Sequence, residues 1–172
     1  GWDEYQRTVG VLVNAGVIED GTKIWWDVRP SHRFPTLEMR IADVCSRLDD
    51  AVSIAALYVC LCRMLYRLRH TNQSWRMYPV FLLGENRWRA QRYGVQGTLF
   101  DFGKGTLVPF RDLLGEIQAL IAEDAAALEC EAEVAHASRI VADGTSADRQ
   151  VATYERLLAS GLSREDALKG VV

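Results

Sequence analysis

The chain has 172 residues with a formal net charge of −3, and 49% of its residues are hydrophobic. This length suits about one domain with a real core, and the composition is ordinary for a globular protein. Arg63 interrupts the longest apolar run, so we expect no membrane span, and the acidic pI of about 5.6 argues against a nucleic-acid-binding protein.

Hydrophobic periodicity and the positions of glycine and proline predict the elements in chain order. A helix is expected over 2–15, and alternating residues predict strands over 22–29 and 36–42 with a proline-containing loop between them. Asp49 or Asp50 can cap the next helix, which runs to about Arg69; its first half is apolar on nearly all sides, so we expect it to be buried against the sheet. The later elements are a short strand around 98–100 and helices over 85–93, 110–128, 130–142, 146–159 and 163–169.

The cysteines and histidines show no ligand spacing. The four cysteines include no C-x-x-C pair, which argues against a zinc site, and we interpret them as buried free thiols of a protein in the reducing cytoplasm. His32, His70 and His136 lie far apart in the sequence, and each is expected to be a surface or loop histidine.

The strand over 36–42 carries the most informative pattern. Glu38 and Arg40 are two residues apart, so both point to one face of a strand while Leu37, Met39 and Ile41 point to the other. A carboxylate is suited to magnesium, and an arginine beside it can form a fork to carboxylate or phosphoryl oxygens. An ordinary cross-strand ion pair on a solvated face is the alternative.

Two further groups carry charge that a site could use. Asp27 and Arg29 repeat the pattern on the preceding strand, so pairing of the strands would place four ionisable groups on one face, either as the floor of a site or as a solvated surface. Between Arg63 and Arg92 the chain has seven arginines and one acid, Glu85. Small anions fit this cluster better than nucleic acid, and a solvated helix face is the alternative.

Three ordered segments, 25–31, 34–43 and 86–94, together with Gly144 to Gln150, resemble the C-terminal half of the bacterial carboxylate–amine ligases, also called glutamate–cysteine ligase type 2 proteins. Glu38, Arg40 and Asp43 are also similar to the E-x-R-x-x-D strand of glutamine synthetases. This chain has Thr36 where that motif has its first arginine, so only Glu38 and, less firmly, Arg40 carry over.

The resemblance implies an α+β fold, with an antiparallel sheet and packed helices as in glutamine synthetases, followed by a mainly helical tail region. Residues 1–111 would be the C-terminal part of the ligase catalytic domain, and residues 112–172 a helical region of the same domain. The segment 1–111 holds 15 Lys or Arg against 11 Asp or Glu, and 112–172 holds 5 against 12, so anionic ligands are expected in the first part.

The implied reaction is that of an ATP-dependent C–N ligase. ATP and Mg²⁺ would activate a small carboxylate, glutamate in the best-known members, as an acyl phosphate, and an amine would attack it to form an amide. Glu38 would be the metal ligand, Arg29 and Arg40 the catalytic residues, and Asp27, Asn86, Arg87 and Arg92 would bind substrate or nucleotide.

Family members are about twice as long, and their N-terminal half supplies further metal ligands. We therefore expect half of an active site here, completed by a missing N-terminal half or a companion chain. A first residue other than Met fits a cut or processed piece, and exposed strand edges would favour a homo-oligomer. The alternatives are a non-catalytic binding or assembly module that retains the ligase fold, and an acyl-phosphate kinase without an amine acceptor.

Overall fold

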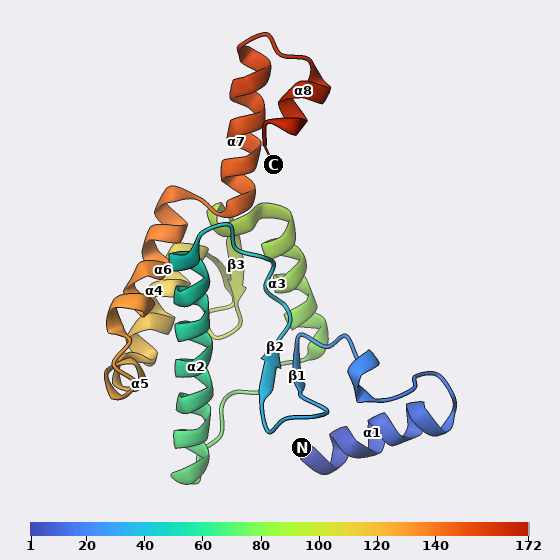
Figure 1. The fold of residues 1–172 in the computed structure, drawn as a ribbon. Helices are drawn as coiled ribbons and strands as arrows, with labels where there is room; N and C mark the ends of the chain where they lie inside the picture. The colour runs from blue at the N-terminus through green and yellow to red at the C-terminus, as the bar shows by residue number, and fades with distance from the viewer. Residues whose placement is uncertain (172) are drawn as a thin grey trace. The chain divides into compact units, whose positions relative to one another are not determined.

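The computed structural model describes residues 1–171 and divides into two compact units, an N-terminal unit of residues 1–44 and a C-terminal unit that begins at Cys45. The N-terminal unit contains helix α1 (Trp2–Asn14), a short 3₁₀ turn η1 (Gly21–Lys23) and the antiparallel strands β1 (Val28–Pro30) and β2 (Leu37–Met39) (Figure 1). The predicted boundary near residue 111 lies close to the start of a helix at Phe110, and the assignment of both parts to one domain stays a prediction.

The C-terminal unit is mainly helical, and one antiparallel hairpin interrupts its helices. Its elements are α2 (Leu48–His70), α3 (Val80–Tyr93), η2 (Gly94–Gln96), β3 (Thr98–Asp101), β4 (Thr106–Pro109), α4 (Phe110–Leu120), α5 (Ala122–Ala127), α6 (Glu131–Asp143), α7 (Ser146–Ala159) and α8 (Arg164–Lys169). The α+β fold class is confirmed, with two small two-stranded sheets in the described residues rather than one larger sheet.

Several predicted boundaries shift for local reasons. The strand predicted over 22–29 starts only at Val28, because the Asp20 carboxylate accepts a hydrogen bond from the Thr22 N–H and begins a 3₁₀ turn instead. The helix predicted over 110–128 breaks at Ile121, whose side chain is fully buried. Ser163 caps α8 as expected from its position, whereas Thr145 rather than Ser146 caps α7.

Helix α2 packs along α6 and α5, and the core of the C-terminal unit lies between them (Figure 1). The prediction that the first half of α2 is buried against the sheet was wrong, since Val52 and Val59 are exposed. The buried members of this core are Cys60, Met64, Ile121, Ala125 and Val134. The expectation that Asp49 or Asp50 caps α2 was also wrong: the helix begins after Arg47, and Asp50 is buried in its first turn.

Helix α2 also meets the length and hydropathy criterion for a membrane span, although Arg63 interrupts its apolar sequence. Leu48–His70 has 23 residues and a mean hydropathy of 1.6, so by length and composition alone it is apolar enough to cross a membrane. Core helices of soluble proteins pass this test as well. In this structure Arg63 and Arg67 of α2 pair with Asp124 of α5, and the expectation of no membrane span stays a prediction.

A fully buried carboxylate joins α2 to α5. Arg63 donates from Nη1 to Asp124 Oδ1 at 2.5 Å, and Arg67 donates from Nη2 to Asp124 Oδ2 at 3.0 Å. The hydrogen bonds from Arg67, and then those from Arg63, hold the pKa of Asp124 below its ordinary value. A buried charge is tolerated only when it is paired and hydrogen-bonded, so these arginines determine which side of α2 faces α5.

We expect Asp124→Asn to lower the free energy of unfolding by about 2–3 kcal/mol, because it removes the buried partner of two arginines. Urea denaturation at pH 7 measures this loss. Since the folded pKa is lowered, the contribution of Asp124 is present above about pH 4 and is lost as the pH falls through the folded pKa.

The matched control is Glu123→Gln. The Glu123 carboxylate is exposed and pairs with Arg67 at 3.3 Å, so its loss should cost less than about 1 kcal/mol. Equal effects of the two substitutions would contradict a special role for the buried carboxylate.

Candidate functional site

The hairpin of the N-terminal unit brings the predicted charged residues together. In the antiparallel register Arg29 lies directly opposite Glu38. Arg29 donates to Glu38 Oε2 from Nη2 at 2.6 Å and from Nε at 3.2 Å, and Arg40 donates from Nη1 to the same oxygen at 3.3 Å. The two strands therefore pair as the sequence analysis supposed, and one carboxylate oxygen of Glu38 accepts from two guanidinium groups.

Arg29 is held much more tightly than a surface arginine. It is only 7% exposed, and its Nη1 donates to the backbone oxygens of Thr22 at 2.6 Å and Ile24 at 3.0 Å. Thr22 lies within η1 and Ile24 directly follows it, so Arg29 fixes that turn to β1 and orients Glu38 at the same time. This geometry is that of a positioning residue, and direct contact of Arg29 with a reacting phosphoryl group stays a prediction.

Arg40 is the more accessible of the two arginines. Its guanidinium carbon lies 4.8 Å from the centre of the Trp25 ring, a distance at which a cation–π contact is favourable. Asp27 joins the same hairpin through its backbone, whose oxygen accepts from the N–H groups of Arg40 at 2.8 Å and Ile41 at 3.2 Å. All four ionisable residues predicted on these strands therefore belong to one hairpin.

The hydrogen bond from Arg29 is the main reason that the pKa of Glu38 lies below its ordinary value. A carboxylate that is ionised in this way suits a hard cation. Glu38 nevertheless offers one side chain, and residues 1–171 contain no cluster of three His, Cys, Asp or Glu side chains that could hold a metal ion. The residues described here therefore do not form a magnesium site without further ligands.

The other predicted site residues lie on α3 in the C-terminal unit. Asn86 donates from Nδ2 to the backbone oxygen of Phe100 at 2.8 Å and accepts from the Phe100 N–H at 2.7 Å, so its amide clamps β3. Arg87 and Arg92 are exposed on the outer side of this helix, and the Arg92 guanidinium lies 5.9 Å from the Tyr93 ring. The structure assigns Asn86 a structural contact, and the ligand-binding roles of all three stay predictions.

A second buried carboxylate was missed by the sequence analysis. Asp50 accepts from Arg149 Nη2 at 3.1 Å and lies 2.9 Å from His136 Nε2, which joins the first turn of α2 to α6 and α7. The expectation that His136 is a surface histidine was wrong, because its ring is largely buried in this contact. The only signal in the sequence was the Gly144 to Gln150 motif, which contains Arg149 but shows nothing of its partner.

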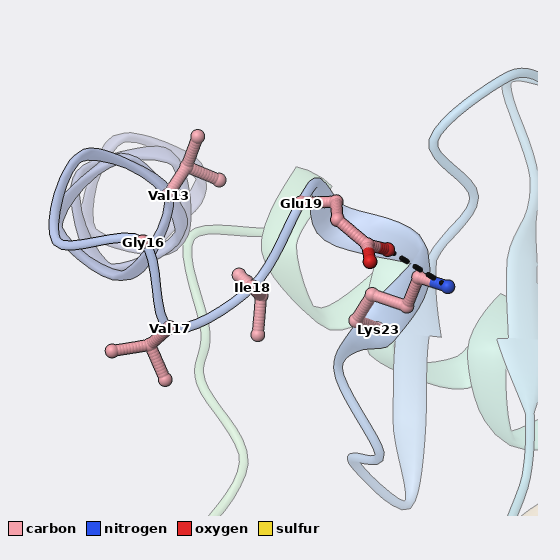
Figure 2. Close-up of a pocket in the computed structure, with 6 residues that line it drawn as sticks. All are labelled: Val13, Gly16, Val17, Ile18, Glu19 and Lys23. Carbon is pink, nitrogen blue, oxygen red and sulfur yellow. Dashed lines mark ion pairs between the residues drawn. The ribbon is translucent and has the colours of Figure 1, made fainter.

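One hollow of the N-terminal unit lies beside the end of α1 and contains none of the predicted site residues. It has a volume of about 500 Å³, and its lining, shown in Figure 2, is Val13, Gly16, Val17, Ile18, Glu19 and Lys23. Glu19 and Lys23 form an exposed ion pair at 2.9 Å across one side of it. The two charged groups neutralise each other, so this hollow offers no reactive group.

Comparison with known proteins identifies the family of this chain. A family model described as glutamate-cysteine ligase family 2 matches residues 1–169. Three relatives carry the name "Putative glutamate–cysteine ligase 2": one from Rhodospirillum rubrum is 62% identical over 98% of this chain, and those from Jannaschia sp. and Ruegeria pomeroyi are each 53% identical over 99% of it. The chain covers 43–45% of these three relatives, so it spans less than half of their length.

The substitution Arg29→Met should raise the pKa of Glu38 towards its ordinary value, because the largest cause of the lowered pKa is removed. A titration of the Glu38 carboxyl carbon by NMR measures this change. Arg40→Met should have a smaller effect, and Arg29→Lys, which keeps the charge but not the fork, should lie between. A Glu38 pKa that does not move in Arg29→Met would show that the ion pair is not formed in solution.

The substitution Asn86→Ala should lower the free energy of unfolding by about 2 kcal/mol, since each lost hydrogen bond to the Phe100 backbone contributes about 1 kcal/mol. Faster amide exchange at Phe100 provides the local measurement. The exposed Gln91→Ala on the same helix is the control. If Asn86→Ala leaves stability unchanged, the amide clamp is not the main role of this residue.

Proposed function

The chain belongs to glutamate–cysteine ligase family 2, and on that basis we propose that it forms part of an ATP-dependent carboxylate–amine ligase. The family supports a ligase-like function. The acyl-phosphate route, the identity of the carboxylate as glutamate and the unnamed amine acceptor belong to this proposal, since the chain spans less than half of its relatives.

The β1–β2 hairpin is the single observation that carries the proposal. It presents an ionised carboxylate, Glu38, beside an accessible guanidinium, Arg40, and a buried arginine, Arg29, sets their positions. Fixed charges that do not need to reorganise are what stabilise charge on a transferring phosphoryl group. A loose surface ion pair would not have this rigidity.

In this proposal each residue of the hairpin has a separate task. Glu38 would supply one carboxylate ligand to Mg²⁺, which would neutralise charge on the phosphates of ATP when bound. Arg40 binds an oxygen of the substrate carboxylate or of the phosphoryl group, and Arg29 keeps the Glu38 carboxylate ionised and oriented. The remaining metal ligands come from a part of the family protein that this chain does not span.

A non-catalytic binding module is the second candidate, and a specific observation favours it. The same Glu38 oxygen that accepts from Arg29 also accepts from Arg40, and the described residues alone provide no metal site. A module that keeps the fold and has lost the reaction would retain this ion-pair network as a structural feature.

An activity measurement separates the two candidates. We would join this chain to the remainder of the Rhodospirillum rubrum relative and assay release of ADP with glutamate and a panel of amines, together with hydroxylamine trapping of an acyl phosphate. We expect turnover in the joined protein and its loss, by at least about a hundredfold, in Glu38→Ala, because a metal ligand would be missing.

Glu19→Ala is the matched control, since this acid lies in the same unit and pairs with Lys23 at the surface. An unchanged rate in Glu38→Ala would overturn the role of Glu38. Absence of turnover with every amine, in a folded joined protein, would favour the non-catalytic module, and trapping of an acyl phosphate without amide formation would indicate a kinase.

A further inference from the structure

Two cysteine thiols meet where α2 packs against the start of α6. The Cys60 sulfur lies 3.5 Å from the Cys130 sulfur, although the two residues are 70 positions apart in the sequence. Cys60 is fully buried within α2, whereas Cys130, the residue directly before α6, is partly exposed. All four cysteines of the chain are free thiols, so this close pair is reduced.

The backbone around Cys130 holds its thiol in this place. The Cys130 N–H donates to the Ala125 oxygen, and the Cys130 oxygen accepts from the Val134 N–H, both at 3.0 Å. Glu129, directly before it, has a φ of 54°, a left-handed conformation that is uncommon for a residue other than glycine. The contact between the two sulfurs therefore belongs to a well-defined connection between α5 and α6 rather than to a loose loop.

A small movement converts this contact into a bond. The sulfurs of a disulfide lie about 2.05 Å apart, so the two atoms need to approach by about 1.5 Å. A cysteine sulfur moves by more than this when its side chain turns from one rotamer to another. We propose that Cys60 and Cys130 are an oxidation site, at which a peroxide produces a disulfide that joins α2 to the start of α6. This inference goes beyond the proposed function and does not depend on the ligase reaction.

The exposure of the two thiols determines the order of the steps. Hydrogen peroxide reaches Cys130 first: the Cys130 sulfur attacks one peroxide oxygen, the O–O bond breaks, and a sulfenic acid and one water molecule result. The Cys60 sulfur then attacks the Cys130 sulfur, the S–O bond breaks, and the departing hydroxide takes the Cys60 proton to form a second water molecule. Two thiols are oxidised to one disulfide, and one hydrogen peroxide is reduced to two water molecules.

The surroundings of Cys60 slow the second step. Burial, then the hydrogen bond with Cys130 and the nearby Asp124 carboxylate, raise the pKa of Cys60 to about 11. The thiolate is the reactive form of cysteine, so little of Cys60 is ready to react at neutral pH. We therefore expect the pair to respond to sustained oxidation. The product has no charge, so the burial that disfavours the thiolate does not disfavour the disulfide.

The disulfide would close a loop that contains the predicted ligand-binding residues of the C-terminal unit. Helix α3, the β3–β4 hairpin, α4 and α5 all lie between Cys60 and Cys130 in the sequence. Asn86, Arg87 and Arg92 on α3 are therefore inside this loop. A cross-link across 70 residues removes many conformations of the unfolded chain, so oxidation should stabilise the folded unit.

The test uses the chain without its other two cysteines, as Cys45→Ala with Cys62→Ala. One equivalent of hydrogen peroxide should lower the number of free thiols from two to none and the mass by two hydrogen atoms, and dithiothreitol should restore both. Cys62 is removed because trypsin leaves Cys60 and Cys62 in one peptide, residues 48–63. Mass spectrometry should find this peptide linked to residues 112–139, which contain Cys130.

Thermal unfolding measures the effect on the fold. The midpoint should rise by at least about 5 °C on oxidation and return to its first value with dithiothreitol. The matched control, Cys60→Ala with Cys130→Ala, keeps the other two thiols, and its midpoint should not rise. The unsubstituted chain gives a second measurement that needs no variant to fold: its free thiols should fall from four to two, with the same two peptides linked.

Four results would overturn the proposal. Thiols that persist after the treatment would show that the pair does not react. A gain of two oxygen atoms at Cys130 beside a free Cys60 would show that oxidation stops at a sulfinic acid. A disulfide between two copies of the chain would show that the pair does not close within one fold. An internal disulfide that lowers the thermal midpoint would show that the fold distorts to form it. None of these measurements reads ligase activity, so failure of the proposed reaction would leave them unchanged.

Discussion

A buried charge must have a partner of opposite sign, and both units of this protein are organised by that requirement. In the C-terminal unit Asp124 is matched by Arg63 and Arg67 from α2, which determines the side of α2 that faces α5. In the N-terminal unit the sign is reversed, because the buried group is Arg29 and its partner is the carboxylate of Glu38. A wrong packing would leave one of these charges without water or a partner, so each pair disfavours other arrangements of its elements.

The Arg29–Glu38 pair also connects the fold to the proposed reaction. The two strands of its hairpin are only three residues long. Strands this short do not by themselves fix the positions of their side chains. Arg29 compensates by binding two carbonyls of the preceding turn and the carboxylate of the opposite strand. A short hairpin can in this way present Glu38 and Arg40 in a fixed arrangement, which is the property that electrostatic catalysis requires.

Exposed apolar residues are the second theme of the structure. Val52 and Val59 on α2, and Phe81 on α3, are exposed although their residue types favour burial. The chain covers less than half of the length of its relatives. In the proposed function, the part of a family member that this chain does not span would supply the further metal ligands and could cover such residues.

Local sequence information placed most of the helices approximately and, through short motifs, indicated the family, because periodicity and motifs act over a few positions. It also placed Glu38 and Arg40 on one strand face. Only the tertiary structure decided that Arg29 is a buried positioning residue, that Asn86 clamps Phe100, and that His136 meets Asp50. These contacts depend on backbone groups of Thr22, Ile24 and Phe100 or on a partner 86 residues away, and neither kind of partner leaves a pattern in the sequence.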